Sequence, residues 1–124
     1  MGYGRVMPAK GFERTAWIFM RISGLLLVFL AIGHLAIMHL IHSVEEVNYA
    51  FVAQRFTTPF WRGYDLLMLW LAMFHGTNGI RTILDDYAKK PMWNRVSKGA
   101  LYLFAATLIT MGTIVLLFFK PTLT

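Results

Sequence analysis

The sequence contains no cysteine. Disulfides, thiolate metal sites, iron–sulfur ligation and cysteine nucleophiles are therefore excluded from this chain, because each of them needs a thiol. Charged residues are also few: they make up 15% of the 124 residues, whereas soluble domains average about 25%. Hydrophobic residues make up 57%, so the chain has too little polar surface to cover a small globule in water. These two shortages predict a membrane protein.

The hydrophobic residues are concentrated in long runs. Residues 22–41 and 100–119 are each twenty residues without a formal charge, enough to cross a hydrocarbon core of about 30 Å at about 1.5 Å per helical residue. Residues 66–80 form a third run of only fifteen, which spans only if its helix reaches into the headgroup layers, with Trp61 and Tyr87 as interfacial anchors. We therefore expect one all-α domain over residues 1–124, a membrane anchor whose three transmembrane helices cover approximately residues 16–42, 61–87 and 98–120.

The positive charges lie mostly on one side of these expected helices. The formal net charge is +6. Nine Lys and Arg residues precede the first run or lie around the second connection, whereas three lie in the first connection or after the third helix. By the positive-inside rule, the N-terminus is cytoplasmic and the C-terminus is outside. We expect a multi-pass protein of the cell's inner (cytoplasmic) membrane, and the basic balance calls for no nucleic-acid partner.

The first connection, residues 43–60, is rich in polar groups and contains a Thr-Thr-Pro turn. We therefore expect a short structured loop there. A unit of three helices has little room for an active site of its own, so we expect the chain to belong to a larger complex.

Four histidines lie at positions 34, 39, 42 and 75. His42 falls at the outer end of the first helix and His39 one turn deeper, where a structural role is the simpler interpretation. Counting residues from Arg21 and Tyr87 places His34 and His75 about 18–20 Å from the cytoplasmic edge. A polar ring at that depth costs free energy unless it is bonded.

Histidine within a membrane helix can ligate haem b, relay protons or hydrogen-bond to another helix. Proton pumps and transporters generally add carboxylates within the membrane, and none lies between Glu13 and Glu45 or after Asp86. A small transporter or channel subunit is therefore disfavoured, whereas haem ligation and interhelical hydrogen bonding stay open. Four residues share one face of the second helix with His75 and form a polar stripe: Asn78, Gly79, Thr82 and Asp86. This stripe must face protein, cofactor or water.

Two segments resemble a known family. They are WIFMRISGLLLVFLAIGH, residues 17–34, and FHGTNGIRTILDDY, residues 74–87. The first helix begins with Arg-x-Ser-Gly and contains a His, the second contains His-Gly-x-x-Gly-x-Arg and Asp-Tyr, and the third is plain. With these features in this order, nearly the whole chain resembles the smaller of the two hydrophobic anchor subunits of succinate:quinone oxidoreductase. This enzyme is also called succinate dehydrogenase or respiratory complex II. The connection FVAQRFTTPFW is similar to the actinobacterial form.

This resemblance implies a haem b-binding anchor that relays electrons from an iron–sulfur subunit to a membrane quinone, expected to be menaquinone. It also implies that the anchor docks the iron–sulfur and flavoprotein subunits, so that succinate is oxidised on another subunit and no catalytic residue lies here. His75 and His34 are then axial ligands to haem iron. We expect two haems, each shared with the larger, companion anchor subunit, with His75 on the cytoplasm-proximal haem and His34 on the distal one; His39 is the competing ligand on the first helix.

The resemblance further implies contacts to a haem propionate or to quinone for residues near the cytoplasmic edge: Arg21, Ser23 and Arg81 to either group, Asp86 and Tyr87 to quinone. Arg21 and Ser23 are equally well interpreted as a positive-inside anchor and a helix-packing residue. Arg81 is alternatively the ion-pair partner of Asp85, four residues later. A fumarate reductase anchor and a haem-free structural anchor are the remaining alternatives, and association into higher oligomers stays open.

Overall fold

The computed structural model describes residues 11–120, and this part of the chain is all-helical. The elements in order are α1 (Phe12–Leu35), the short π-helix η1 (Ala36–Ile41), α2 (Tyr49–Arg55), α3 (Pro59–Tyr87) and α4 (Pro91–Phe118). No strand is present in residues 11–120. The predicted all-α fold is therefore confirmed.

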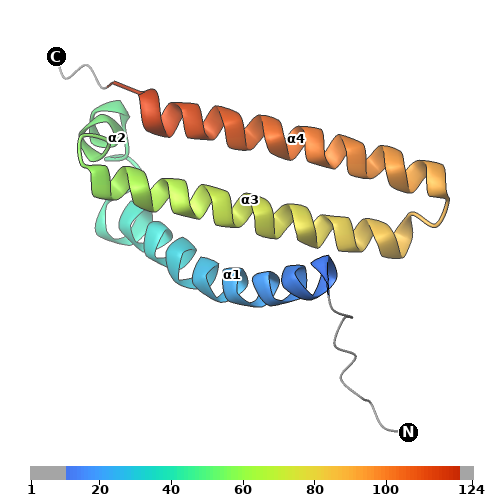
Figure 1. The fold of residues 1–124 in the computed structure, drawn as a ribbon. Coiled ribbons are helices and arrows are strands. Elements are labelled where there is room, and N and C mark those ends of the chain that lie inside the picture. Colours follow the sequence, from blue (N-terminus) through green and yellow to red (C-terminus); the bar gives the residue numbers. More distant parts are fainter. Residues whose placement is uncertain (1–10, 121–124) are drawn as a thin grey trace, which may run out of the picture.

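The three long helices lie side by side, with α3 between α1 and α4 (Figure 1). Successive long helices run in opposite directions, so the start of α1, the end of α3 and the start of α4 meet at one end of the bundle (Figure 1). We call this the charged end; η1, α2 and the end of α4 form the opposite end, the α2 end. The most polar of the three long helices thus occupies the middle of the layer.

Local signals explain where these helices begin. Both α3 and α4 start with a proline in the first turn, a position where its fixed φ suits a helix and its missing N–H costs nothing. At the start of α2, the Asn48 side-chain oxygen accepts a hydrogen bond from the Phe51 backbone N–H at 3.1 Å. The connection expected as a loop therefore contains a capped helix, and α4 begins at Pro91 rather than at residue 98.

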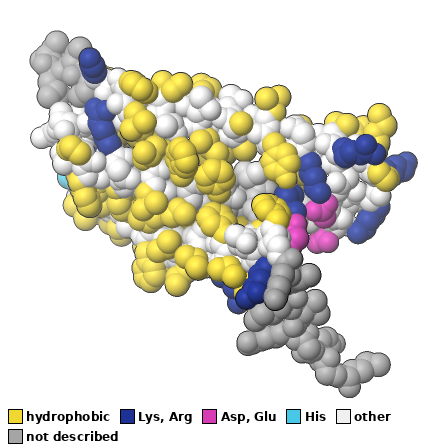
Figure 2. Space-filling model, viewed as in Figure 1, with side chains coloured by type: hydrophobic (Ala, Val, Ile, Leu, Met, Phe, Trp, Pro, Cys, Tyr) yellow, Lys and Arg dark blue, Asp and Glu magenta, His cyan; other side chains and the backbone are white. Residues whose placement is uncertain are grey.

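Two of the long helices are apolar and long enough to cross a membrane, by length and composition: Phe12–Ile41, with a mean hydropathy of 2.3, and Pro91–Phe118, with 2.2. Large apolar side chains stay exposed along both, including Phe29 at 70% and Leu103 at 72%. Figure 2 shows hydrophobic side chains over the middle of the molecule and most charged ones near its ends. Such large apolar surfaces indicate contact with lipid or with other protein chains.

Polar contacts and a close helix approach hold α4 against α3. Arg62 of α3 donates to the backbone carbonyls that end α4, at 3.2 Å from Leu116, 3.1 Å from Leu117 and 2.8 Å from Phe119. These carbonyls have no partner within their own helix. At Gly112, an added Cβ would lie 2.7 Å from Leu69 Cδ2, so glycine lets the two helices approach closely.

Candidate functional site

His75 of α3 faces α1. Its Nδ1 atom lies 2.8 Å from Ser23 Oγ, and Ser23 is 1% exposed. The Ser23 hydroxyl also lies 3.5 Å from the Met20 carbonyl oxygen, which it can approach as donor. When Ser23 donates to Met20, its oxygen accepts from Nδ1–H of His75, and the lone pair of the imidazole is then on Nε2.

Gly24 allows this position of the ring. A Cβ added there would lie only 3.1 Å from His75 Cε1, so a larger residue would push the imidazole away from α1. Among residues 11–120, Nε2 of His75 has no hydrogen-bond partner. The ring is therefore fixed through one nitrogen and has the other available for a ligand.

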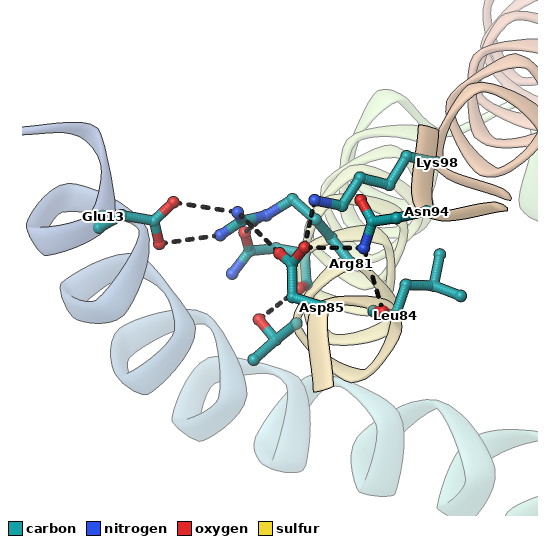
Figure 3. A network of polar contacts seen from close by, with 8 residues as sticks. Glu13, Arg81, Leu84, Asp85, Asn94 and Lys98 are labelled. Carbon is teal, nitrogen blue, oxygen red and sulfur yellow. Dashed lines mark hydrogen bonds and ion pairs between the residues drawn. The ribbon is translucent and has the colours of Figure 1, made fainter. Parts of the chain in front are cut away.

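The charged end is closed by an ion pair between α1 and α3 (Figure 3). Arg81 donates to both carboxylate oxygens of Glu13, each at 3.0 Å, and its Nε donates to Asn78 Oδ1 at 3.1 Å. The expected partner Asp85 is further from Arg81, at 3.8 Å. Arg81 thus has a bidentate partner that the sequence did not indicate. Beside it, a groove of about 410 Å³ runs between α1 and α3.

Asp85 links α3 to α4 at the same end (Figure 3). It forms an ion pair with Lys98 and accepts a hydrogen bond from Asn94 at 3.1 Å. The Glu13 and Asp85 carboxylates both lie beyond the uncharged stretches. The Glu13–Arg81 and Asp85–Lys98 ion pairs therefore tie the three helices together there.

The other residues expected to meet a propionate or quinone lie apart from His75. Arg21 is exposed and stacks on the Trp17 ring, with 4.0 Å between its Cζ and the ring centroid. Asp86 is exposed, and Tyr87 is 83% exposed at the last turn of α3. The structure thus brings Ser23 to His75, whereas Arg21, Asp86 and Tyr87 point to the outside of the three-helix layer.

His34 lies near the α2 end, beside a carboxylate that the sequence analysis did not single out. Its Nδ1 atom is 3.5 Å from Asp65 Oδ1 of α3, and Nδ1 is buried without a hydrogen bond in the described part of the chain. The same Asp65 oxygen accepts from Arg55 Nη2 of α2 at 3.3 Å. The Arg55 guanidinium in turn stacks on Trp61, 4.1 Å from the ring centroid.

The two remaining histidines have different surroundings. His39 lies in η1 and is exposed. His42 lies 3.5 Å from Glu46 and packs edge-on against Phe51, with ring centroids 4.8 Å apart. Neither ring is enclosed between α1 and α3 as His34 and His75 are.

The helix register places His34 and His75 at different levels of the bundle. Glu13 pairs with Arg81, Ser23 with His75 and His34 with Asp65. His34 lies eleven residues beyond Ser23 on α1, about 16 Å along the helix axis. The nearly equal depths expected from residue counting are therefore wrong. Arg21 and Tyr87 are not level reference points, because the contact of Ser23 with His75 places Arg21 well inside the length of α3 rather than at its end.

Sequence reasoning missed Asp65 and Arg55. Asp65 directly precedes the uncharged run at 66–80, and Arg55 is one of the three cations on the less charged side of the expected helices. The available signal was an acidic residue where α3 enters its apolar part, which needs a cation or a hydrogen-bond donor nearby. Which cation it meets depends on the fold of the first connection.

Comparison with known proteins gives two matches. Residues 6–114 match the family described as succinate dehydrogenase/fumarate reductase transmembrane subunit. The chain is 34% identical over 74 residues to a protein of Archaeoglobus fulgidus named succinate dehydrogenase hydrophobic membrane anchor subunit. That match covers 60% of this chain and 62% of the relative.

Proposed function

Because the chain belongs to the succinate dehydrogenase/fumarate reductase transmembrane subunit family, we propose that it is the smaller, haem b-binding anchor of a succinate:quinone oxidoreductase. In this role it docks an iron–sulfur subunit and a flavoprotein subunit and helps deliver their electrons to a membrane quinone, menaquinone in our proposal. The observation that carries the proposal is the His75 imidazole, fixed by Ser23 through Nδ1 with Nε2 left without a partner among residues 11–120.

The residues present fit two haem b groups, one at each level of the bundle. A haem b held by axial imidazoles supplies a one-electron carrier. His75 would donate Nε2 near the charged end, with Ser23 holding its other nitrogen, as is usual for a metal-bound histidine. His34 would provide the ligand nearer the α2 end through Nε2, while its Nδ1 faces Asp65 without a hydrogen bond in the described part of the chain. Each haem would take its second ligand from the companion anchor subunit.

We further propose that α3 is a third membrane span. It has 29 residues and lies antiparallel between the two apolar helices, so it crosses whatever layer they cross. At about 1.5 Å per residue it is long enough for the hydrocarbon core and both headgroup regions. The positive-inside rule then puts the charged end, with its many Lys and Arg residues, on the cytoplasmic side of the inner membrane.

The cytoplasmic position of the charged end suits both of its proposed partners. Exposed cations and aromatic side chains gather around the α3–α4 connection, among them Lys89, Lys90, Trp93 and Arg95. This surface is available for the iron–sulfur subunit. The groove between α1 and α3, lined partly by Arg81, is available for a haem propionate or quinone, and the exposed Asp86 and Tyr87 are available for quinone.

The proposal is tested by counting haem in the purified complex. We expect about two haems b per flavin, since two imidazoles at separate levels each hold one. Pyridine haemochrome quantification against covalently or tightly bound flavin gives this ratio directly. A ratio of about one haem per flavin would mean that only one of the two proposed sites holds haem. A complex with flavin but no b-type spectrum would overturn haem binding altogether.

Tyr87→Phe is expected to impair quinone reduction without removing haem. The hydroxyl of an exposed tyrosine at the end of α3 can donate a hydrogen bond to a quinone carbonyl, and phenylalanine cannot. We expect a loss of roughly tenfold in kcat/KM for quinone, the size of one lost hydrogen bond. Quinone titrations of the purified complex measure it, with Tyr49→Phe, an exposed tyrosine of α2 at the opposite end of the bundle, as the matched control. Unchanged quinone kinetics would remove Tyr87 from the quinone site.

A haem-free structural anchor is the second candidate. The same Ser23–His75 contact favours it, because an interhelical hydrogen bond of this kind stabilises a membrane bundle without any cofactor. The absence of a b-type spectrum from an assembled, active complex would select this function. The direction of electron transfer is a separate question. A fumarate reductase would use the same anchor, and the reduction potential of the quinone would decide whether electrons flow to or from it.

A further inference from the structure

Asp65 and Arg55, which form a cluster with His34, have no role in what has been proposed so far. The members of this cluster come from three elements, α3, α2 and the end of α1. Side-chain exposure is 5% for Arg55, 13% for Asp65 and 32% for His34. Charges enclosed to this degree are costly unless each is paired, so the arrangement is specific rather than incidental.

The Asp65 carboxylate is the acceptor nearest to an unpaired buried donor. His34 Nδ1 has no hydrogen bond in the described part of the chain and lies 3.5 Å from Asp65 Oδ1. A charge-assisted N–H···O bond is about 2.8 Å long, so a shift of roughly 0.7 Å would form it. No competing acceptor for Nδ1 is found among residues 11–120.

Arg55 determines where this carboxylate sits. Its Nη2 donates to the same Oδ1 atom at 3.3 Å, and its guanidinium lies over the Trp61 ring. Since Arg55 is held by this contact and by burial, it fixes the Asp65 oxygen that also lies nearest to His34 Nδ1. The short helix α2 thus positions the Arg55 cation beside the Asp65 carboxylate.

We infer that Asp65 is a positioning residue for His34: it accepts the Nδ1 hydrogen bond, directs Nε2 toward the iron and makes the imidazole a stronger electron donor. This inference rests on the proposed function, because it needs a haem at His34. A carboxylate on the far nitrogen of a metal-bound histidine fixes the tautomer and raises the basicity of the ligand. A more basic ligand stabilises the ferric state, which lowers the reduction potential.

The test is Asp65→Asn in the whole complex, followed by redox titration of the b-type spectrum. Asparagine keeps the size of the side chain but removes its charge, so we expect both haems to be retained and the potential of one to rise. That haem must be the one lost in His34→Ala. The matched control is Glu46→Gln, which removes a carboxylate beside His42 at the same end and is expected to leave both potentials unchanged.

Two results would overturn the inference: unchanged potentials in Asp65→Asn, or a shift confined to the haem lost in His75→Ala. Should the asparagine variant not assemble, Asp65→Glu decides. It keeps the charge but moves the oxygen, so we expect altered low-spin EPR g values for the His34 haem only, and unaltered values would equally overturn the inference. If His34→Ala loses no haem that the wild-type complex contains, the proposed function is contradicted instead. The two failures are therefore distinguishable.

Discussion

Replacing His75 with alanine is expected to remove one haem b from the purified complex, so that the haem-to-flavin ratio falls from about two to about one. No other imidazole lies at this level of the bundle within residues 11–120, since His34, His39 and His42 all lie beyond it along the chain toward the α2 end. The neighbouring Ser23 and Gly24 have no side-chain nitrogen that could replace His75 as a haem ligand. Haemochrome quantification and the low-temperature optical spectrum measure the loss.

Ser23→Ala is the variant that separates haem ligation from a purely structural histidine. If His75 ligates iron, alanine at position 23 leaves Nε2 in place, so the haem is retained and its potential changes. If the contact is only an interhelical hydrogen bond, the two variants remove the same bond and each destabilises the subunit by about 1 kcal/mol. Equal effects on stability with an unchanged spectrum in both would contradict ligation by His75.

The long helices could be predicted from the sequence because lipid imposes a simple rule on uncharged runs. Their ends could not, since hydropathy reports the part of a helix that suits lipid and α4 begins with polar residues at Pro91. The proline itself was the signal for that start. In the same way, Asn48 was the signal for α2, the helix that the sequence analysis interpreted as loop.

Within the candidate site, the two histidines stand out from the sequence, but their contacts do not. His75 and His34 stand out because a polar ring within an apolar helix needs a reason. Which residues contact the two rings, here Ser23 and Asp65, depends on the axial position of α3 relative to α1. The length of the first connection and the packing at glycines together determine that position. Residue counting from the wrong edge gave equal depths, whereas the pairing of Glu13 with Arg81 fixes the register. His34 and His75 therefore lie at two levels about 16 Å apart, one for each of the two proposed haems.

His34→Ala is expected to remove the other haem, again lowering the haem-to-flavin ratio from about two to about one. Loss of this ring also leaves Asp65 without its neighbour on α1, while the ion pair with Arg55 at 3.3 Å keeps the carboxylate charge balanced. The subunit should therefore still assemble, and the haem held by His75 should keep its potential. Redox titration of the variant complex, with one b-type component in place of two, is the measurement.

His39→Ala is the matched control, because it removes a histidine five residues further along the same helical segment. His39 is exposed within η1, and its removal is expected to leave both haems in place. If His39→Ala removes a haem and His34→Ala does not, the ligand on the first helix is His39, and the Asp65 cluster serves another purpose. If both variants and His75→Ala leave the haem content unchanged, this chain supplies no axial ligand, and its histidines hold the helices together.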